Sequence, residues 1–411
     1  MLLNLKNIGR FYNKTSININ GITVLAGTNG TGKSTIGKAL YCIYNSLYDY
    51  ENKIEEERRT SIYRNYRLIQ GNYRSSIKNR KKINEITDYM FHSPTDENIL
   101  IQLENLTGIS KEEIDKDVVE RIKNAIIISD DDILNVIIKK RFESEFDSQV
   151  GHINYPGETS EIEVIIKDKS IKIQIDDDKV LINDKIKLLK DIAYIDDPYV
   201  IDDIYQFSYS GDYSHRMDII KKLRGREEEK LTAIDDYIVN ERLTELYEKL
   251  DNICGGIVAQ KDEDEYEYKD KKLKQRLSVK NLSTGMKSFV VIKTLLSKGC
   301  LEENGIVILD EPEAHLHPEW MLLYAEMIVL LQKILKINFV ISTHSSEFLS
   351  YIELYSKKHE IADDCKYYLL EEDRNDSTIT NVFDYTENID KIYDVLTRPF
   401  LWASKELDSQ L

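Results

Sequence analysis

The sequence predicts an α/β fold in which a mixed central sheet is flanked by helices. A β-branched apolar run at 22–26 is followed by a glycine-rich loop and then by a helix-compatible stretch at 35–48. A second apolar run, at 305–309, ends in the acidic pair Asp310 and Glu311. Short apolar runs bounded by turns, alternating with longer helical stretches, are typical of α/β sheets.

Length and composition limit the classes of protein. The chain has 411 residues, which suits one compact head with a subsidiary lobe. Its net charge of −17 disfavours general attraction to nucleic acid or anionic lipid. Apolar runs fall well short of the roughly 20 residues that span a membrane, so we expect no membrane segment and a cytoplasmic location. Four dispersed cysteines predict reduced structural thiols, and His315 and His317 are spaced wrongly for a helical zinc site.

The glycine-rich loop matches the phosphate-binding pattern G-x-x-x-x-G-K-[ST]. Its glycines let backbone N–H groups turn toward phosphates, and the following helix adds the positive end of its dipole. Lys33 is expected to reach the β- and γ-phosphates, the Ser34 hydroxyl to bind magnesium, and Thr35 to hold the α-phosphate. The residues predicted to bind the nucleotide here are Asn29, Gly30, Thr31, Gly32, Lys33, Ser34 and Thr35.

The acidic pair supplies the second half of such a site. Asp310 is expected to hold magnesium through water, because it ends an apolar strand at the edge where the loop lies. Glu311 follows it and is placed to polarise an attacking water, which makes it the predicted catalytic carboxylate. ATP and Mg²⁺ are therefore the expected cofactors.

Three further motifs follow in a recognisable order: N-L-S-T-G-M-K at 281–287, E-P-E-A-H-L-H-P at 311–318 and I-S-T-H at 341–344. In this order they resemble the ATPase heads of the ABC class, in the branch of RecF, SMC and OLD-like proteins. Within that branch the chain is similar to AAA family ATPases of bacterial anti-phage defence, such as the PtuA subunit of Septu. The resemblance implies a P-loop NTPase fold with an ABC-type head.

The resemblance also implies roles for residues that lie outside the loop. Ser283 and Gly285 would cap the γ-phosphate of a nucleotide bound by another subunit, so a homodimer or a higher even oligomer is implied. His344 would contact that phosphate and sense hydrolysis, and His315 and His317 would lie in a loop that crosses between subunits. No glutamine stands out as the usual magnesium ligand between the lobes, and Asp196 or Asp197 could substitute for it.

We expect four parts along the chain. Residues 1–50 and 281–411 form the ATPase head, 51–140 a mostly helical insert, 141–197 a β-rich part of the head, and 198–280 a helical lobe leading to the S-T-G motif. Within these, 125–128 reads as a strand, 161–182 as alternating strands, 227–253 as an amphipathic helix, 262–270 as an exposed hairpin and 366–382 as another. No sustained heptads appear, so long coiled coils are excluded.

Two surface features suggest partners. Arg58–Lys82 holds nine basic residues, no acidic ones and three tyrosines, so it could contact nucleic acid; a basic face docked on acidic neighbours is the alternative. Near the end of the chain, Phe400, Leu401 and Trp402 could anchor a separate protein or cover the core. No nuclease motif follows His344, so an effector, a nuclease being the expected kind, would be a separate chain.

The leading hypothesis is an ATP-hydrolysing dimer that senses or switches a separate effector in anti-phage defence. The alternative is a DNA-repair or recombination clamp of RecF type, in which ATP closes two heads over DNA. A transporter subunit is disfavoured by the 250 residues between Lys33 and Ser283. An inactive scaffold is disfavoured by the presence of Glu311.

Overall fold

A computed structural model describes residues 1–70, 78–176, 179–183, 185–205, 212–225, 243–262 and 265–409. The chain divides into two compact units. One unit joins Met1–Tyr48 with Lys139–Leu411, and the other is Asp49–Ile138. No helix among the described residues is long and apolar enough to cross a membrane.

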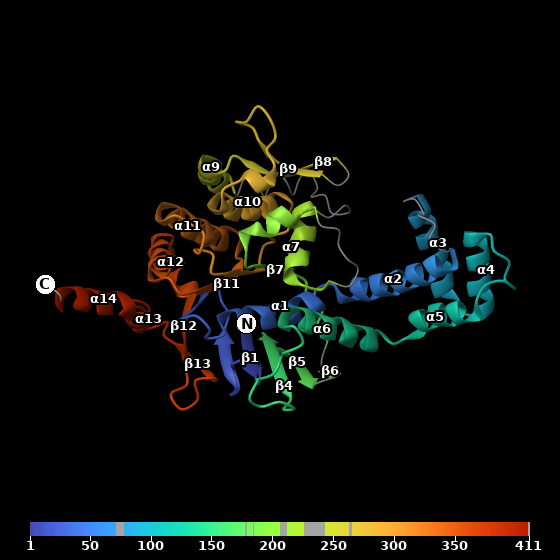
Figure 1. The fold of residues 1–411 in the computed structure, drawn as a ribbon, viewed down its shortest axis with the longest axis horizontal. Helices are drawn as coiled ribbons and strands as arrows, with labels where there is room; N and C mark the ends of the chain where they lie inside the picture. The colour runs from blue at the N-terminus through green and yellow to red at the C-terminus, as the bar shows by residue number, and fades with distance from the viewer. Residues whose placement is uncertain are drawn as a thin grey trace. The chain divides into compact units, whose positions relative to one another are not determined.

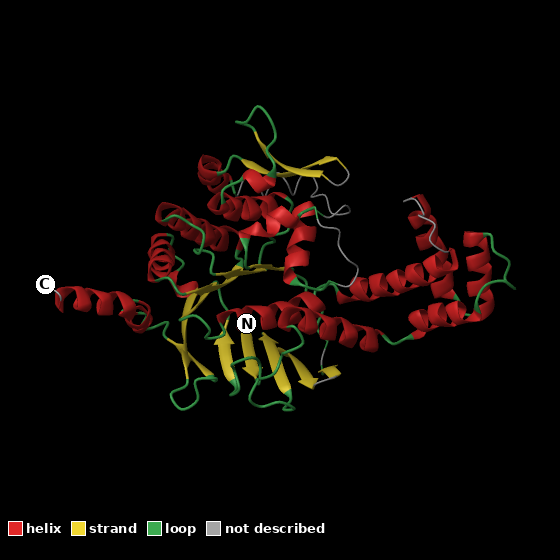
Figure 2. Ribbon diagram, viewed as in Figure 1, coloured by secondary structure: helices red, strands yellow, loops and turns green. Residues whose placement is uncertain are grey.

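A six-stranded mixed sheet organises the first unit (Figures 1 and 2). Its order is β13-β12-β3-β11-β10-β7, and only the edge strand β13 is antiparallel among these six. The strands are β3 (Ile22–Gly27), β7 (Ile192–Ile195), β10 (Ile306–Asp310), β11 (Asn338–Thr343), β12 (Cys365–Glu372) and β13 (Thr380–Asp384). Strands β3 and β10 are almost wholly buried, as a sheet covered on both faces requires.

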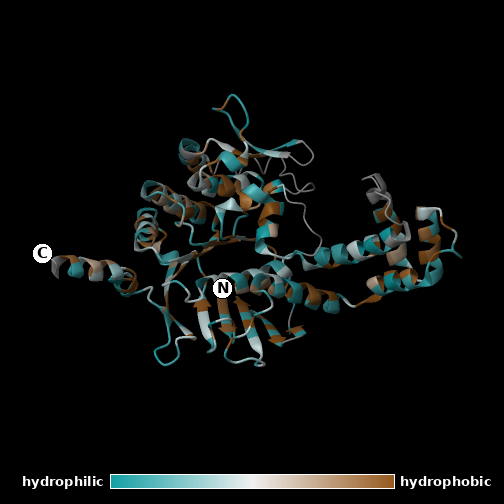
Figure 3. Ribbon diagram, in the orientation of Figure 1, coloured by the Kyte–Doolittle hydropathy of each residue, from teal (hydrophilic) through white to brown (hydrophobic). Residues whose placement is uncertain are grey.

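A second sheet has five antiparallel strands in the order β2-β1-β4-β5-β6. They are β1 (Leu2–Lys6), β2 (Thr15–Asn18), β4 (Ser160–Ile166), β5 (Lys169–Asp176) and β6 (Lys179–Ile182). Buried and exposed residues alternate along β2 and β4, so one face of this sheet packs inward. Figure 3 shows hydrophobic and hydrophilic residues mixed along these strands. The strands expected at 161–182 are confirmed.

Helices cover both faces of the six-stranded sheet. Helix α1 (Lys33–Leu47) contacts β3, β7, β10 and β11, and in Figure 1 it lies between the two sheets. Beyond the other face lie α10 (Thr284–Ser297), α11 (Pro318–Leu335) and α12 (Ser346–Lys358). The fold class expected from the sequence, a mixed sheet flanked by helices without a long coiled coil among the described residues, is confirmed.

The segment expected to be a helical lobe contains helices and one hairpin. Its elements are the 3-10 turn η1 (Pro198–Asp203), α7 (His215–Arg224), α9 (Thr244–Ile253), β8 (Gly256–Asp262), β9 (Glu265–Asp270) and η2 (Val279–Asn281). A hairpin is present, but β8-β9 begins at Gly256, before the expected range of 262–270. It is also not simply exposed, because Tyr266 and Tyr268 are buried in the core. Of the amphipathic helix expected at 227–253, residues 227–242 lie outside the described residues.

The second unit is helical in its described residues. It contains α2 (Tyr50–Gln70), α3 (Lys78–His92), α4 (Asp96–Thr107), α5 (Lys116–Ile127) and the first residues of α6 (Asp130–Phe146). Ile62, Ile86, Leu103 and Ile122 belong to its separate hydrophobic core. The strand expected at 125–128 is wrong, because this apolar run is the last turn of α5 and packs partly against that core.

The last part of the chain forms the hairpin β12-β13 and two helices, α13 (Asp390–Leu396) and α14 (Arg398–Ser409). Pro399 does not stop the chain from being helical, because it occupies the start of α14, where a missing N–H costs no hydrogen bond. Phe400, Leu401 and Trp402 are 64%, 59% and 66% exposed. They therefore do not cover the core, which corrects one of the two expectations for this segment.

Candidate functional site

The glycine-rich loop connects β3 to α1 and has the backbone geometry of a phosphate cradle. Gly30 and Gly32 adopt left-handed conformations, with φ of 79° and 85°. A Cβ on Gly27 would lie 2.6 Å from the carbonyl oxygen of Leu370, so only glycine fits there. The Thr31 hydroxyl donates to the carbonyl oxygen of Thr28 at 2.9 Å and fixes the turn. Asn29 and Gly30 are exposed at its tip, and Ser34 and Thr35 are half-buried in the first turn of α1.

Lys33 is held so that its amine lies inside the loop. The side chain is 5% exposed, and its Nζ donates to the carbonyl oxygens of Gly27 and Thr28, each at 2.9 Å. Burial lowers the pKa of Lys33, while the carboxylates of Glu311 and Asp310 act against that change. The loop and this amine fit the triphosphate of a nucleotide, because a glycine-rich turn before a helix N-terminus offers N–H donors to phosphate and the buried cation lies inside the same loop.

Asp310 ends β10, beside the strand that carries Ser342. The two residues are paired in register, and the Ser342 hydroxyl donates to Oδ1 of Asp310. The Tyr194 hydroxyl donates to Oδ2 of the same carboxylate at 3.1 Å. Each carboxylate oxygen thus accepts one bond from a neighbouring strand. Asp310 and Ser34 together offer the carboxylate and hydroxyl oxygens that Mg²⁺ prefers, so these residues fit the ion that the sequence predicts.

Glu311 has an unusual backbone conformation, with φ of 46°. A left-handed non-glycine residue costs of order 1–3 kcal/mol and persists where the surrounding structure fixes it. Its N–H donates to the carbonyl oxygen of Ser342 at 3.0 Å. Its Oε1 lies 3.1 Å from Nδ1 of His344 and 3.8 Å from Nζ of Lys33. The turn therefore directs the carboxylate toward the loop and toward the end of β11.

Glu313 makes a second connection between the same two strand ends, and the sequence did not single it out as a site residue. Thr343 donates its hydroxyl to Oε1 of Glu313 and accepts the N–H of Ser345 at 3.0 Å. Glu313 is 6% exposed, and among the described residues its Oε2 has no hydrogen-bond partner. Burial raises the pKa of Glu313. The bond from Thr343 to Glu313 connects the turn after β10 to the end of β11.

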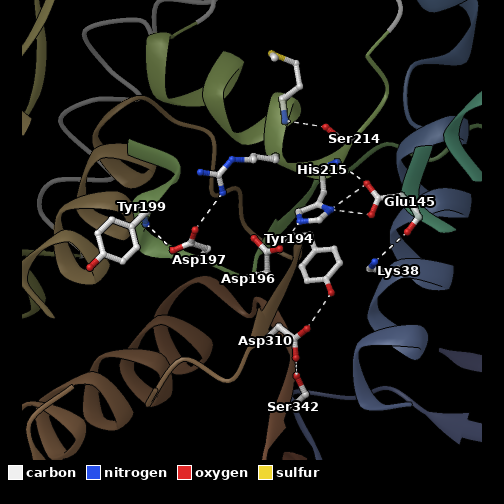
Figure 4. A network of polar contacts seen from close by, with 12 residues as sticks. Lys38, Glu145, Tyr194, Asp196, Asp197, Tyr199, Ser214, His215, Asp310 and Ser342 are labelled. Carbon is white, nitrogen blue, oxygen red and sulfur yellow. Dashed lines mark hydrogen bonds and ion pairs between the residues drawn. The ribbon is translucent and has the colours of Figure 1, made fainter. Parts of the chain in front are cut away.

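A buried network lies behind Asp310 and is drawn in Figure 4. The rings of Tyr194 and His215 stack, with centroids 4.2 Å apart. His215 pairs through Nε2 with Asp196 at 2.9 Å and through Nδ1 with Glu145 at 2.7 Å. Burial alone would lower the pKa of His215, but the two carboxylates outweigh it and raise that pKa to about 9. The imidazole is therefore charged at neutral pH.

Asp196 and Asp197, the two candidates for a magnesium ligand between the lobes, have different partners. Burial would raise the pKa of Asp196, but the bond with His215 outweighs it and the pKa is lowered. Asp197 accepts the N–H of Tyr199 at 2.8 Å and pairs with Arg216 at 3.2 Å. Both carboxylates are thus engaged within this chain, and a role of either one as a magnesium ligand stays a prediction.

The S-T-G motif opens α10. Ser283 is the N-cap residue and is exposed, but within the described residues its side chain makes no capping hydrogen bond. Gly285 is buried, and a Cβ there would lie 2.8 Å from Cε3 of Trp320. A packing requirement therefore accounts for this glycine whatever its role toward phosphate. His315 and His317 are both exposed, and the His315 ring meets Tyr199 edge-on with centroids 5.8 Å apart.

The structure brings some of the predicted residues together and leaves others apart. Lys33, Asp310, Glu311 and His344 converge at the carboxyl ends of β3, β10 and β11, next to the loop. Ser283 and Gly285 lie at the start of α10, where Gly285 packs against Trp320 of α11. Tyr194, Glu145 and His215 were missed, because their contacts join distant segments and leave no local pattern in the sequence.

The basic stretch of the second unit is only partly described, because the side chains of 68–82 lie outside the described residues. Arg58 donates to the carbonyl oxygens of Ala125 and Ile126, at 2.9 and 2.6 Å. Arg59 pairs with Glu55 and Asp88. Tyr66 is 1% exposed and cannot stack on a base. For these residues the alternative reading, a basic face docked on acidic and carbonyl neighbours, is the one observed. Nucleic-acid contact by the exposed Arg64 and Arg67 stays a prediction.

The fold and the loop define the class as a P-loop nucleotide-binding protein: a strand, a cradle with a buried lysine, a helix, and an acidic strand end beside it. A family model described as AAA ATPase domain matches residues 1–349 of the chain. The chain belongs to this family of AAA ATPase domains.

Three solved structures are similar to the chain. The SMC head domain from Thermotoga maritima has 12% identity and a TM-score of 0.40, over 93% of this chain and 97% of that one. An Smc head domain with an extended coiled coil, bound to the C-terminal domain of ScpA derived from Pyrococcus furiosus, has 13% identity and a TM-score of 0.43, over 96% and 98%. An SMC head bound to the C-winged helix domain of ScpA has 13% identity and a TM-score of 0.44, over 93% of this chain and 96% of that one. No curated protein matches the sequence significantly.

Proposed function

We propose that the chain is an ATP-hydrolysing head that pairs with a second copy, each copy completing the nucleotide site of the other. One observation carries this proposal. The carboxylate of Glu311 lies 3.1 Å from His344 and 3.8 Å from the loop amine of Lys33. A base for water, a histidine suited to sense the terminal phosphate and a phosphate-binding cation therefore meet at one edge of the sheet.

These side chains have complementary tasks in hydrolysis. Glu311 would orient a water molecule and take its proton as the water attacks the γ-phosphorus and the bond to the leaving ADP breaks. Lys33 would offset the charge on the phosphate oxygens, and His344 would contact the γ-phosphate and respond to its loss. Ser34 and Asp310 would hold magnesium, which when bound neutralises charge between the β- and γ-phosphates.

Pairing is proposed because the motif residue Ser283 is exposed and its hydroxyl is not used to cap its own helix. The N-terminus of a 14-residue helix presents N–H groups and a partial positive charge, both suited to an anionic ligand. In the proposed dimer that ligand is the terminal phosphate of the nucleotide held by the partner.

Complementation between two inactive variants tests the shared site. Lys33→Ala removes the loop cation, and Ser283→Arg places a bulky side chain at an exposed position that the core does not need. Each variant alone should be inactive, while a mixture should regain phosphate release, because each mixed dimer has one intact composite site. The matched control is a mixture of Lys33→Ala with Glu311→Gln, in which both changes damage the same half of the site. The shared site would be contradicted if phosphate release recovered in the control mixture, or if it did not recover in the mixture of Lys33→Ala with Ser283→Arg.

We also propose, from the resemblance of the motifs, that hydrolysis switches a separate effector in anti-phage defence, a nuclease being the expected kind. Expression of the chain together with a neighbouring gene should lower phage plating, and Lys33→Ala should abolish that protection. Protection that survives Lys33→Ala, or protection by the neighbouring protein alone, would remove this part of the proposal.

A further inference from the structure

Both oxygens of the Asp310 carboxylate accept hydrogen bonds from neighbouring strands. The Ser342 hydroxyl donates to one oxygen, and Tyr194 donates to the other at 3.1 Å. Tyr194 lies on β7, which runs parallel beside β10 with Tyr194 opposite Ile308. Its ring is 1% exposed, and its hydroxyl is directed at Oδ2 of Asp310. Asp310 is thereby restricted to one orientation.

The Tyr194 ring is itself held in place. His215 stacks on it with ring planes 24° apart, and the imidazole is fixed between Glu145 and Asp196 at 2.7 and 2.9 Å. The carboxylate of Glu145 also accepts a hydrogen bond from the backbone N–H of His215. The backbone carbonyl oxygen of Glu145 accepts a hydrogen bond from Nζ of Lys38 at 2.9 Å. The network therefore connects α1, α6 and α7 to the strand end at Asp310 (Figure 4).

We propose that Tyr194 and His215 are positioning residues for the magnesium-binding carboxylate of Asp310. The inference rests on the proposed function only in taking Asp310 as the ligand of a nucleotide-bound metal. A phenylalanine at 194 would fill the same space and stack on the same imidazole, so the hydroxyl is the atom directed at Asp310. The Tyr194 ring has few alternative rotamers, because it stacks on His215 and both imidazole nitrogens of His215 are paired with carboxylates. The Tyr194 hydroxyl is therefore preorganised toward Asp310.

The test is the magnesium dependence of nucleotide binding, which can be measured whether or not ATP is turned over. Binding of a fluorescent ATP analogue to the full chain is titrated against Mg²⁺, and again in EDTA. Tyr194→Phe and His215→Gln should each raise, by about tenfold, the Mg²⁺ concentration that gives half of the Mg²⁺-dependent increase in nucleotide binding. A tenfold change is the loss of affinity expected when one hydrogen bond to a charged group is removed. Affinity in EDTA should stay unchanged, because the loop and Lys33 are untouched.

Two controls separate positioning from general destabilisation. Tyr324→Phe removes a phenol hydroxyl from a residue that is 2% exposed and packs in the core against Phe289. His359→Gln replaces a partly buried histidine that pairs with Glu326 instead of the Asp310 network. Both should keep the wild-type Mg²⁺ midpoint. If a variant is poorly folded, its affinity in EDTA falls along with its melting temperature, and the ratio of affinities with and without Mg²⁺ remains the readout.

Each outcome decides the proposal. An unchanged Mg²⁺ midpoint in both Tyr194→Phe and His215→Gln would overturn it, as would an equal shift in the controls. A shift in the two network variants alone supports it, even if the wild type binds Mg²⁺-nucleotide without hydrolysing it, an outcome that would refute the proposed function and leave the positioning role intact. If Mg²⁺ does not tighten nucleotide binding in the wild type, both are overturned.

Discussion

Oε1 of Glu311 lies 3.1 Å from Nδ1 of His344, so the turn after β10 and the end of β11 meet through two site residues. The contact exists because Glu311 takes a left-handed backbone conformation, with φ of 46°, that turns its side chain back toward the sheet edge. A strained residue that places two functional groups together is typical of a reaction centre.

Glu311→Gln should stop turnover without preventing nucleotide binding. Glutamine keeps the shape of the side chain but cannot accept the proton of an attacking water, so phosphate release should fall by about 10²- to 10⁴-fold. The nucleotide-bound pair should persist longer, which size-exclusion chromatography with ATP can detect. Glu319→Gln, at an exposed acid in the first turn of α11, is the control and should behave as wild type. Turnover near the wild-type rate would exclude Glu311 as the base.

Ser283→Ala should separate a structural cap from a ligand contact. Loss of a capping serine usually costs about 1 kcal/mol of stability, but within the described residues the Ser283 side chain caps nothing. The free energy of unfolding should therefore hardly change, while ATP-dependent pairing weakens. Ser345→Ala is the stability control, because its hydroxyl accepts the N–H of Phe348 at 3.1 Å and should show the usual loss. A large destabilisation of Ser283→Ala with normal pairing would favour a structural role.

His215 should make stability depend on pH. Its pKa is about 9 in the folded chain against 6.5 as the ordinary value, because Asp196 and Glu145 favour the charged imidazole. The stabilisation is complete below pH 6.5 and is lost as the pH rises through 9, about 3 kcal/mol in total. Urea unfolding at pH 6.5 and pH 9 should show this loss in the wild type. His215→Gln should not show this loss of stability between pH 6.5 and pH 9. His317→Gln, at an exposed histidine, should show it as the wild type does. Equal pH dependence in His215→Gln and the wild type would contradict the assignment.

The sequence predicted what is encoded in contiguous residues. The loop from Gly27 to Ser34, the strand ending at Asp310 and the hairpin β12-β13 each have a local signature of glycine spacing, apolar runs or alternation, and the structure has each of these elements. The assignments of residues to magnesium and to phosphate stay predictions.

The sequence could not reveal contacts that depend on how distant segments meet. Tyr194 and Asp310 are 116 residues apart, and the stack of Tyr194 on His215 follows from the placement of α7 against β7. The apolar run at 125–128 was misread because β-branched residues at the end of a short helix look like a strand when their packing partners are unknown. The left-handed Glu311 also has no signature, since Glu disfavours that conformation.

Arg58→Ala should destabilise the helical unit rather than abolish a nucleic-acid contact. The guanidinium donates to the carbonyl oxygens of Ala125, Ile126 and Ile128, at 2.9, 2.6 and 2.6 Å, and pairs with Asp130. These carbonyls lie where α5 ends, and the last carbonyls of a helix have no partner within the helix, so the arginine serves as a cap from a neighbouring helix. Its loss should cost about 1–3 kcal/mol, measured by chemical denaturation.

Arg67→Ala is the matched change for nucleic acid, because Arg67 is exposed on the same helix. It should leave the stability of the unit unchanged. If this stretch does bind nucleic acid, Arg67→Ala should weaken the binding and reduce its salt dependence, because one phosphate contact is lost. Arg58→Ala would then affect binding only through unfolding of the unit. A stable Arg58→Ala variant that has lost nucleic-acid binding would contradict the structural role of Arg58 and restore the full basic stretch as a binding surface.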